Sequence, residues 1–303
     1  EYSQRFKRNK FALKAYWGLG NIYQVNKELD TALKYIYKGL DLSTEMGDTT
    51  IRGNLINNVG LIHMSKNKYK AALTYFFQGL IFLTREGDKL AVGSIYSNIG
   101  RVYFLEGLLD SSLYYHNLSL ELRLTLGQKS SLADSYDNIA TIYKLQGKIK
   151  ECIDYQLKTL MLREELKDRY GIAAIYVNLA NTYSYIEDYE NAEKYFLEAQ
   201  KIYTAVEFKN GIGLALNGLG DVYESQLKFD EADLKYQEAL IIFEKTDSKI
   251  SIGETYVNMG TLQGKLGNYQ EEIKFLNVAI KIFRDIEVNI ALANGLIYLT
   301  NAY

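Results

Sequence analysis

A short pattern returns every 40 residues along this chain of 303 residues. It begins with Asn or Gly, continues with an aliphatic residue and a small residue, and in most copies ends in Tyr. The small residue of the pattern falls at Gly20, Gly60, Gly100, Ala140, Ala180, Gly220 and Gly260. No insertion or deletion disturbs this spacing, so the chain is built from internal repeats. Periods of roughly 20–50 residues are typical of solenoids and related arrays.

Each repeat contains two helical patterns separated by short breaks. In the second copy, Ile56, Val59, Gly60 and His63 recur at spacings of three and four residues, as on one face of a helix. A second pattern runs from 69 to 83, and Gly87 is suited to the end of that helix. We call these two helices of each repeat helix A and helix B. The chain has no proline, which favours long uninterrupted helices, and the prediction is an all-α solenoid of antiparallel helix pairs.

These residues resemble the tetratricopeptide repeat family over essentially the whole chain. Tyr96, Ile99, Gly100 and Tyr103 match the family pattern of helix A. Helix B is matched by two sets of residues, which are Ala72, Phe76 and Gly79, and Ala192, Phe196 and Ala199. The resemblance implies a right-handed superhelix over residues 1–303, with seven full repeats and a partial repeat at each end. Residues 1–7 match the phase of a helix-B tail, and an eighth helix A is expected from about Ile290 to Tyr303. Because neither end carries a polar capping repeat, we interpret the chain as a section of a longer protein or as one whose ends are covered by self-association.

The sequence departs from the family in its period, which is 40 rather than about 34 residues. The spacing from Gly60 to Ala72 is the same as in the family, so the extra residues lie between Gly79 and Tyr96. We expect them to extend the end of helix B and the start of the next helix A. The longer repeats of kinesin light chain and of the bacterial Rap-type peptide receptors are similar in this respect.

Composition gives no sign of catalysis or of a cofactor. The formal net charge is −2, which disfavours a nucleic-acid partner, and no apolar run is long enough to span a bilayer. Cys152 stands in the alanine column of helix B and is expected to be a small buried residue. His63 and His116 stand in aromatic columns, so we interpret both as packing residues. The chain is therefore predicted to be non-enzymatic, without a catalytic residue, metal site or cofactor.

The candidate binding site is a column of asparagines two positions before the small residue of helix A. Its members are Asn58, Asn98, Asn138, Asn178 and Asn258. Asparagine is a mediocre helix former, so this recurrence calls for a cause. The resemblance implies that helix A lines a concave surface and that amides at this position grip the backbone of an extended peptide. The alternative is a structural ladder in which the amides bridge neighbouring A helices, and the two interpretations are compatible.

The columns beside the asparagines vary from repeat to repeat, and we expect them to set specificity. The candidates there are Arg101, Asn181, Asp134, Asp137 and Asp221. Arg101 lies one repeat before the two aspartates of the fourth copy, so these groups are expected to pair with each other. Asp221, Glu224 and Glu254 form an acidic zone that suits a basic or polar partner.

Two functions fit this sequence. The first is a scaffold that holds a peptide or protein segment in the groove of the solenoid. The second is a sensory or regulatory segment of a larger signalling protein such as a sensor kinase or a transcription regulator. Either function makes the partner a protein or peptide, and the compartment does not follow from these residues.

Overall fold

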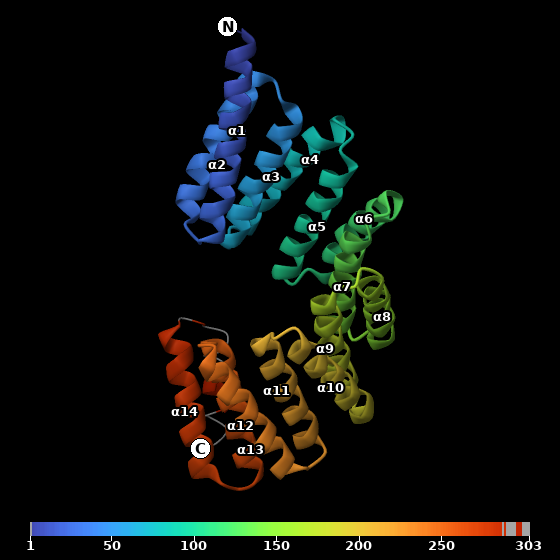
Figure 1. Ribbon diagram of the computed structural model, residues 1–303, viewed down its shortest axis with the longest axis vertical. Coiled ribbons are helices and arrows are strands. Elements are labelled where there is room, and N and C mark those ends of the chain that lie inside the picture. The colour runs from blue at the N-terminus through green and yellow to red at the C-terminus, as the bar shows by residue number, and fades with distance from the viewer. Residues whose placement is uncertain (1, 287, 289–294, 299–303) are drawn as a thin grey trace. The chain divides into compact units, whose positions relative to one another are not determined.

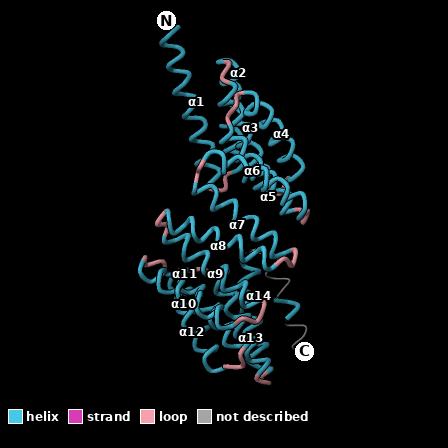
Figure 2. Tube along the Cα trace, turned by 90° about the vertical axis from the view of Figure 1, so that its right-hand side faces the viewer, coloured by secondary structure: helices cyan, strands magenta, loops and turns pink. Residues whose placement is uncertain are grey.

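The computed structural model describes residues 2–286, 288 and 295–298, and the described chain is helical with short loops and without a strand (Figures 1 and 2). The helices are α1 (Tyr2–Val25), α2 (Leu29–Met46), α3 (Thr49–Ser65), α4 (Tyr69–Arg85), α5 (Lys89–Leu105), α6 (Leu109–Leu126), α7 (Lys129–Leu145), α8 (Ile149–Glu165), α9 (Arg169–Tyr185), α10 (Tyr189–Ala205), α11 (Lys209–Ser225), α12 (Phe229–Lys245), α13 (Lys249–Lys265) and α14 (Tyr269–Asp285). The predicted all-α solenoid of helix pairs is confirmed.

The odd-numbered helices are helix A of each repeat and the even-numbered ones are helix B, in phase with the sequence period. From α3 onward, each helix A begins 40 residues after the one before it. Helix α4 continues to Arg85 and α5 begins at Lys89, so the residues between Gly79 and Tyr96 are helical apart from a three-residue break. The extra residues of the long repeat therefore lengthen both helices, as predicted.

The loops reverse the chain through one left-handed residue every 20 positions. Six of these residues are glycines, namely Gly47, Gly87, Gly107, Gly127, Gly147 and Gly267. At Gly87 the φ is +72°, and the N–H of the following Asp88 donates to Leu83 O at 3.0 Å. This is the way a left-handed residue closes the end of a helix. The side chain of Asp88 then accepts from Ala91 N and caps the start of α5.

The start of the chain differs from the sequence prediction. Residues 1–7 match the phase of a helix-B tail, which predicts a break before the first helix A. Instead, α1 runs without interruption from Tyr2 to Val25. Lys7 and Arg8 stand where the second repeat has Gly47 and Asp48, so both the left-handed residue and the N-cap carboxylate are missing and nothing ends the helix there.

The chain divides into two compact units, residues 1–155 and 156–303, and each is described by itself. In the first unit α1 to α7 pack in chain order, and in the second α9 to α14 do so, while α8 crosses the boundary. Both units bury the small residue that recurs in every helix A. The eighth helix A, expected from about Ile290 to Tyr303, lies largely outside the described residues.

Helices A and B of one repeat cross closely at the small column. A Cβ added to Gly60 would lie 2.6 Å from the ring of Phe76, and one added to Gly220 would lie 2.4 Å from the ring of Tyr236. Beside this crossing, Tyr103 stacks on Tyr115 with ring centroids 5.5 Å apart. The tyrosine that ends the repeat pattern therefore serves inter-helix packing.

The histidines and the cysteine also lie where the sequence placed them. His63 is half-buried and stacks on Tyr75 at 5.1 Å. His116 is buried, and Cys152 is inaccessible to solvent. These observations confirm that the three residues pack inside the repeats.

Candidate functional site

Three asparagines of the helix-A column form rungs to the preceding helix A. Asn58 Nδ2 donates to Asn21 Oδ1 at 2.8 Å, which joins α3 to α1. Asn98 Nδ2 donates to Asn57 Oδ1 at 3.0 Å and joins α5 to α3. In the second unit, Asn258 Nδ2 donates to Asp221 Oδ1 at 3.0 Å and joins α13 to α11. The structural ladder is therefore present at these positions.

The rungs leave part of each amide available. A primary amide has two N–H donors and an oxygen with two lone pairs, and each rung uses one donor. Asn98, Asn138, Asn178 and Asn258 are half-buried, and Asn58 is 8% exposed. The column therefore has a structural role and still reaches the surface at most of its positions, so binding by these amides stays a prediction.

The column one turn after the asparagines is the accessible one. Its members on α5, α7, α9 and α11 are exposed, and they are Arg101, Thr141, Asn181 and Asp221. We call the surface formed by this column and the asparagine column the helix-A face, and describe it separately in each unit. Arg101, Asp134, Asp137, Asn58, Asn98 and Asn138 belong to the first unit, and Asn178, Asn181, Asp221 and Asn258 to the second.

The expected pairing of Arg101 with Asp134 or Asp137 does not form. Arg101 makes no ion pair within the described part of the chain, and the negative charge of Asp134 acts on Arg123 instead. Arg123 Nη1 donates to Ser131 O at 2.9 Å and to Ser135 Oγ at 2.6 Å. Burial lowers the pKa of Arg123, and the nearby carboxylate of Asp134 partly offsets this shift by raising the pKa. Arg101 is thus left as an exposed cation on the helix-A face.

The acidic zone of the second unit is also arranged differently from the prediction. Glu224 is only 7% exposed, and its Oε1 lies 2.8 Å from Lys265 Nζ. The hydroxyl of the fully buried Tyr236 lies 2.7 Å from Glu224 Oε2 and 2.7 Å from Asp221 Oδ1. Glu224 is therefore buried and paired within the protein and is not available to a basic partner, whereas Asp221 and Glu254 are exposed.

The protein environment shifts the titration of this zone. Desolvation by the surrounding helices is the main cause that raises the pKa of Asp221 to about 7, and the neighbouring Glu224 adds to it. Desolvation also raises the pKa of Glu254 and that of the Tyr236 hydroxyl. Asp221 is solvent-accessible in spite of this crowding, so the shift indicates partial neutralisation near pH 7 rather than complete burial.

Sequence reasoning missed Tyr236 as part of this zone. Its column in helix B otherwise holds Ile36, Phe76, His116, Gln156, Phe196 and Leu276, and a tyrosine there looks like one more aromatic packing residue. The available signal was the coincidence of a hydroxyl in this column with two acidic residues, Asp221 and Glu224, on the helix A that it crosses.

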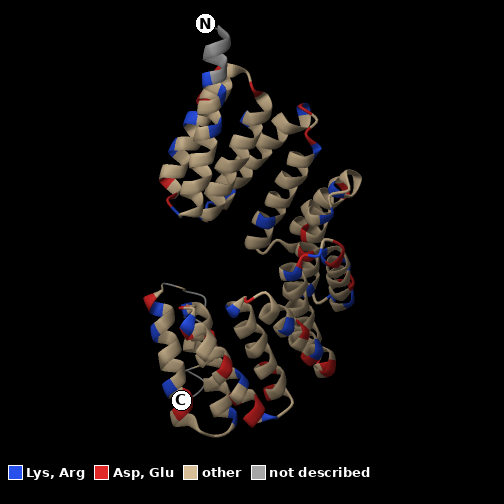
Figure 3. Ribbon diagram, viewed as in Figure 1, with Lys and Arg blue, Asp and Glu red and all other residues tan. Residues whose placement is uncertain are grey.

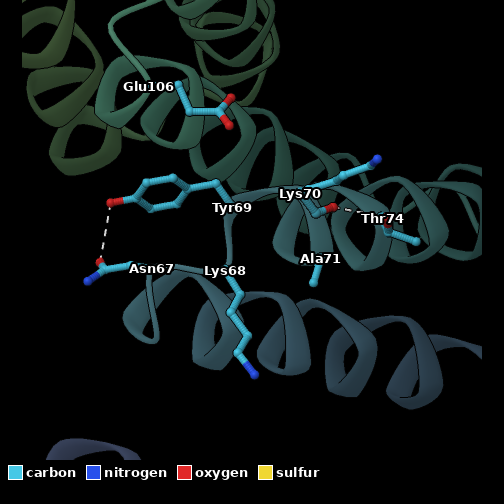
Figure 4. A pocket seen from close by; sticks show the side chains of 7 residues that line it. All are labelled: Asn67, Lys68, Tyr69, Lys70, Ala71, Thr74 and Glu106. Carbon is cyan, nitrogen blue, oxygen red and sulfur yellow. Dashed lines mark hydrogen bonds between the residues drawn. The ribbon is translucent and has the colours of Figure 1, made fainter.

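A pocket of about 630 Å³ lies at the α3–α4 loop and is lined by Asn67, Lys68, Tyr69, Lys70, Ala71, Thr74 and Glu106 (Figure 4). The Tyr69 hydroxyl donates to Asn67 Oδ1 at 3.2 Å, and the two lysines point away from each other. None of the residues predicted for the site lines this pocket.

The described residues contain no group of three or more His, Cys, Asp or Glu side chains that could hold a metal ion. Lysine and arginine are interspersed with aspartate and glutamate over both units (Figure 3). In the described part of the chain no helix is both long and apolar enough to cross a membrane.

Comparison with known families adds to this geometry. The model of the tetratricopeptide repeat matches residues 131–205 and 211–285, and both stretches hold helix pairs with the small and aromatic columns described above. The chain belongs to the tetratricopeptide repeat family. No curated protein sequence matches it.

Several solved tetratricopeptide repeat structures share the fold at low sequence identity. BtubC from P. vanneervenii is 18% identical with a TM-score of 0.65, over 73% of this chain and 92% of that one. Aspartyl phosphate phosphatase F from Bacillus subtilis is 14% identical with a TM-score of 0.65, over 96% and 83%. A signal transduction ATPase with a tetratricopeptide repeat sensor from Pyrococcus horikoshii is 14% identical with a TM-score of 0.71, over 96% of this chain and 44% of that protein.

Proposed function

We propose that this chain is a non-enzymatic scaffold that binds a peptide or protein segment along the helix-A face. The observation that carries the proposal is the contrast between the two columns of that face. Three asparagines are held by rungs to the neighbouring helix A, whereas the column one turn later is exposed on α5, α7, α9 and α11 and varies in charge and size. A rigid row of polar anchors beside a variable row is what recognition of an extended segment needs.

The exposed column would supply the specificity. Arg101 is a cation without an ion-pair partner among the described residues of the first unit, and it suits a carboxylate of the bound segment. Asn181 in the second unit offers donors and an acceptor to a peptide backbone. Asp221 in the same unit would face a polar or basic side chain. A solved Rap protein in complex with competence and sporulation factor is 14% identical to this chain, with a TM-score of 0.59 over 98% of it and 97% of that chain, and this likeness supports the proposal.

Binding can be tested with peptides selected from a random display library against the intact chain. We expect Arg101→Ala to weaken the peptides that bind to the first unit about tenfold, and Asn181→Ala to weaken those that bind to the second unit by the same factor, because a contact of roughly 1.4 kcal/mol is lost. Both side chains are exposed, so the unfolding free energy should change by less than about 0.5 kcal/mol. Fluorescence anisotropy with labelled peptides and urea unfolding give the two readouts.

The matched controls are Lys34→Ala on α2 and Glu244→Ala on α12, which are exposed helix-B positions in the first and second unit. They should leave the affinity unchanged. If the helix-B substitutions weakened the peptides while the helix-A substitutions did not, the binding surface would lie on helix B and the proposal would be wrong.

A second candidate function is a sensory segment within a larger signalling protein. The observation in its favour is the likeness to the repeat sensor of the Pyrococcus horikoshii ATPase, of which this chain spans 44%. The two candidates use the same face, and they differ in what the binding event controls. Sequencing the full gene separates them, because the second candidate requires an effector domain encoded beside these repeats.

A further inference from the structure

The contact between Asp221, Tyr236 and Glu224 has too few hydrogens if both carboxyls are ionised. The Tyr236 oxygen lies 2.7 Å from Asp221 Oδ1 and 2.7 Å from Glu224 Oε2. Each contact of this length between two oxygens needs a hydrogen between them, and a phenol has only one. The second hydrogen must therefore reside on one of the two carboxyl groups.

The neighbouring groups decide how this proton is held. Lys265 Nζ of α13 lies 2.8 Å from Glu224 Oε1 and favours a charged Glu224. Asn258, also of α13, donates to Asp221 and brings no charge. Glu272 of α14 lies against Gly264, next to Lys265, and Asn181 is the uncharged member of the same column on α9. The pair of carboxyls thus has one cation in contact, on Glu224, and none on Asp221 among the described residues, which is too little to keep both ionised at 2.7 Å from one phenol.

We propose that Asp221, Glu224 and Tyr236 form a proton-held lock that joins α11 to α12 and, through Asn258, to α13, and that loss of one proton to the solvent opens it. With the proton gone, a single phenolic hydrogen serves two carboxylates, and one contact becomes a repulsion between lone pairs. Glu224 is 7% exposed and tied to Lys265, whereas Asp221 is accessible to solvent. Asp221 is therefore the group that turns away.

Opening the lock changes the helix-A face in two ways. The rung from Asn258 to Asp221 is lost, so α13 loses its tie to α11 at this position. At the same time a full negative charge appears on the exposed column of the second unit. The lock thus makes the rigidity and the charge of this part of the face depend on pH, whether or not the face binds a peptide.

The test compares the intact chain with the variant Asp221→Asn. The asparagine N–H supplies the second hydrogen at every pH and does not titrate. Its nitrogen cannot also accept from Asn258, so the variant loses that rung at every pH alike. Burial raises the pKa of Asp221 to about 7 from its ordinary value of 3.8, and this direction gives the sign of the effect. Between these values the folded protein holds a proton that the unfolded chain has released, so the wild type loses stability as the pH rises through this window. The folding equilibrium constant of the variant relative to wild type should rise by up to about tenfold per pH unit in the window and stay level above it.

The control variant is Glu244→Gln, an exposed carboxylate on α12, which should show a constant difference from wild type over the same pH range. A pH-independent difference for Asp221→Asn would overturn the proposal. A second variant, Tyr236→Phe, has precedents in Phe76 and Phe196 of the same column. Hydrogen exchange of α11, corrected for the intrinsic rate, should depend on pH in the wild type and lose this dependence in Tyr236→Phe. An unchanged dependence would also contradict the lock. Neither readout requires a peptide, so they are independent of the proposed function.

Discussion

Replacing His116 with phenylalanine should make the first unit markedly more resistant to acid. His116 is 2% exposed, its Nδ1 has no hydrogen-bond partner among the described residues, and its ring lies against Gly100. Burial is the main cause that lowers the pKa of His116 to about 4, and the positive charges of Arg123 and Arg101 add to it. The folded protein therefore holds this imidazole in the neutral form.

The sign and size of the effect follow from linkage. The depressed pKa means that the unfolded chain takes up a proton below about pH 6.5 that the folded chain refuses until about pH 4. Stability is retained above that window and lost as the pH falls through it, by about 3 kcal/mol in total. His116→Phe removes this loss, so urea unfolding should show the variant gaining on the wild type by about 3 kcal/mol between neutral pH and about pH 4.

Phenylalanine should fit at position 116. The equivalent Phe76 lies under Gly60 at the same close distance as His116 under Gly100, 2.6 Å and 2.7 Å from an added Cβ. The matched control is His63→Phe, because His63 is half-buried and stacked on Tyr75, and a smaller gain is expected there. Equal acid profiles for wild type and His116→Phe would show that the buried imidazole does not limit stability.

Two glycines of the asparagine column should respond in opposite directions to the same substitution. A Cβ added to Gly218 would lie 2.2 Å from the ring of Phe196, which is 1% exposed. A Cβ added to Gly18 would have no neighbour within 4 Å. Gly218→Ala should therefore lower the free energy of unfolding by about 1–3 kcal/mol through overpacking. Gly18→Ala should instead raise the free energy of unfolding by about 0.5–1 kcal/mol, which is the difference between alanine and glycine inside a helix.

Urea unfolding of both variants measures this difference, with wild type as the reference. The two substitutions match in chemistry, column and helical context, so their opposite signs isolate the packing of Phe196. If Gly218→Ala stabilised the chain as Gly18→Ala does, the break in the asparagine column at position 218 would not be caused by this ring.

These two glycines also show which features of the fold can be predicted from the sequence and which cannot. The 40-residue period predicts the helix pairs, the lengthened helices and the small column, because each of these depends only on the spacing of residues in the sequence. It does not distinguish Gly18 from Gly218, because the difference lies in where a ring from another helix points. For the same reason the sequence predicts an asparagine ladder but not that Asn21, Asn57 and Asp221 are its acceptors.

Charge was the harder part to predict. Arg101 and Asp134 are one repeat apart and look like a pair, yet the charge of Asp134 acts on Arg123, a residue of helix B. Glu224 looks like part of a solvated acidic zone, yet it is buried against Tyr236 and Lys265. In both cases the partner that decides the outcome lies outside the helix-A columns that were compared. Comparing equivalent positions of helix A alone therefore does not identify that partner.

Site-specific photo-crosslinking shows whether a bound segment lies along the helix-A face. A benzophenone amino acid is placed in turn at Thr141 on α7 and Asn181 on α9, and at the helix-B positions Lys34 and Glu244, all of which are exposed. With peptides selected against the wild-type chain, we expect covalent capture from position 141 for those that bind to the first unit and from position 181 for those that bind to the second. We expect none from positions 34 and 244. Capture from the helix-B positions alone would contradict binding along the helix-A face.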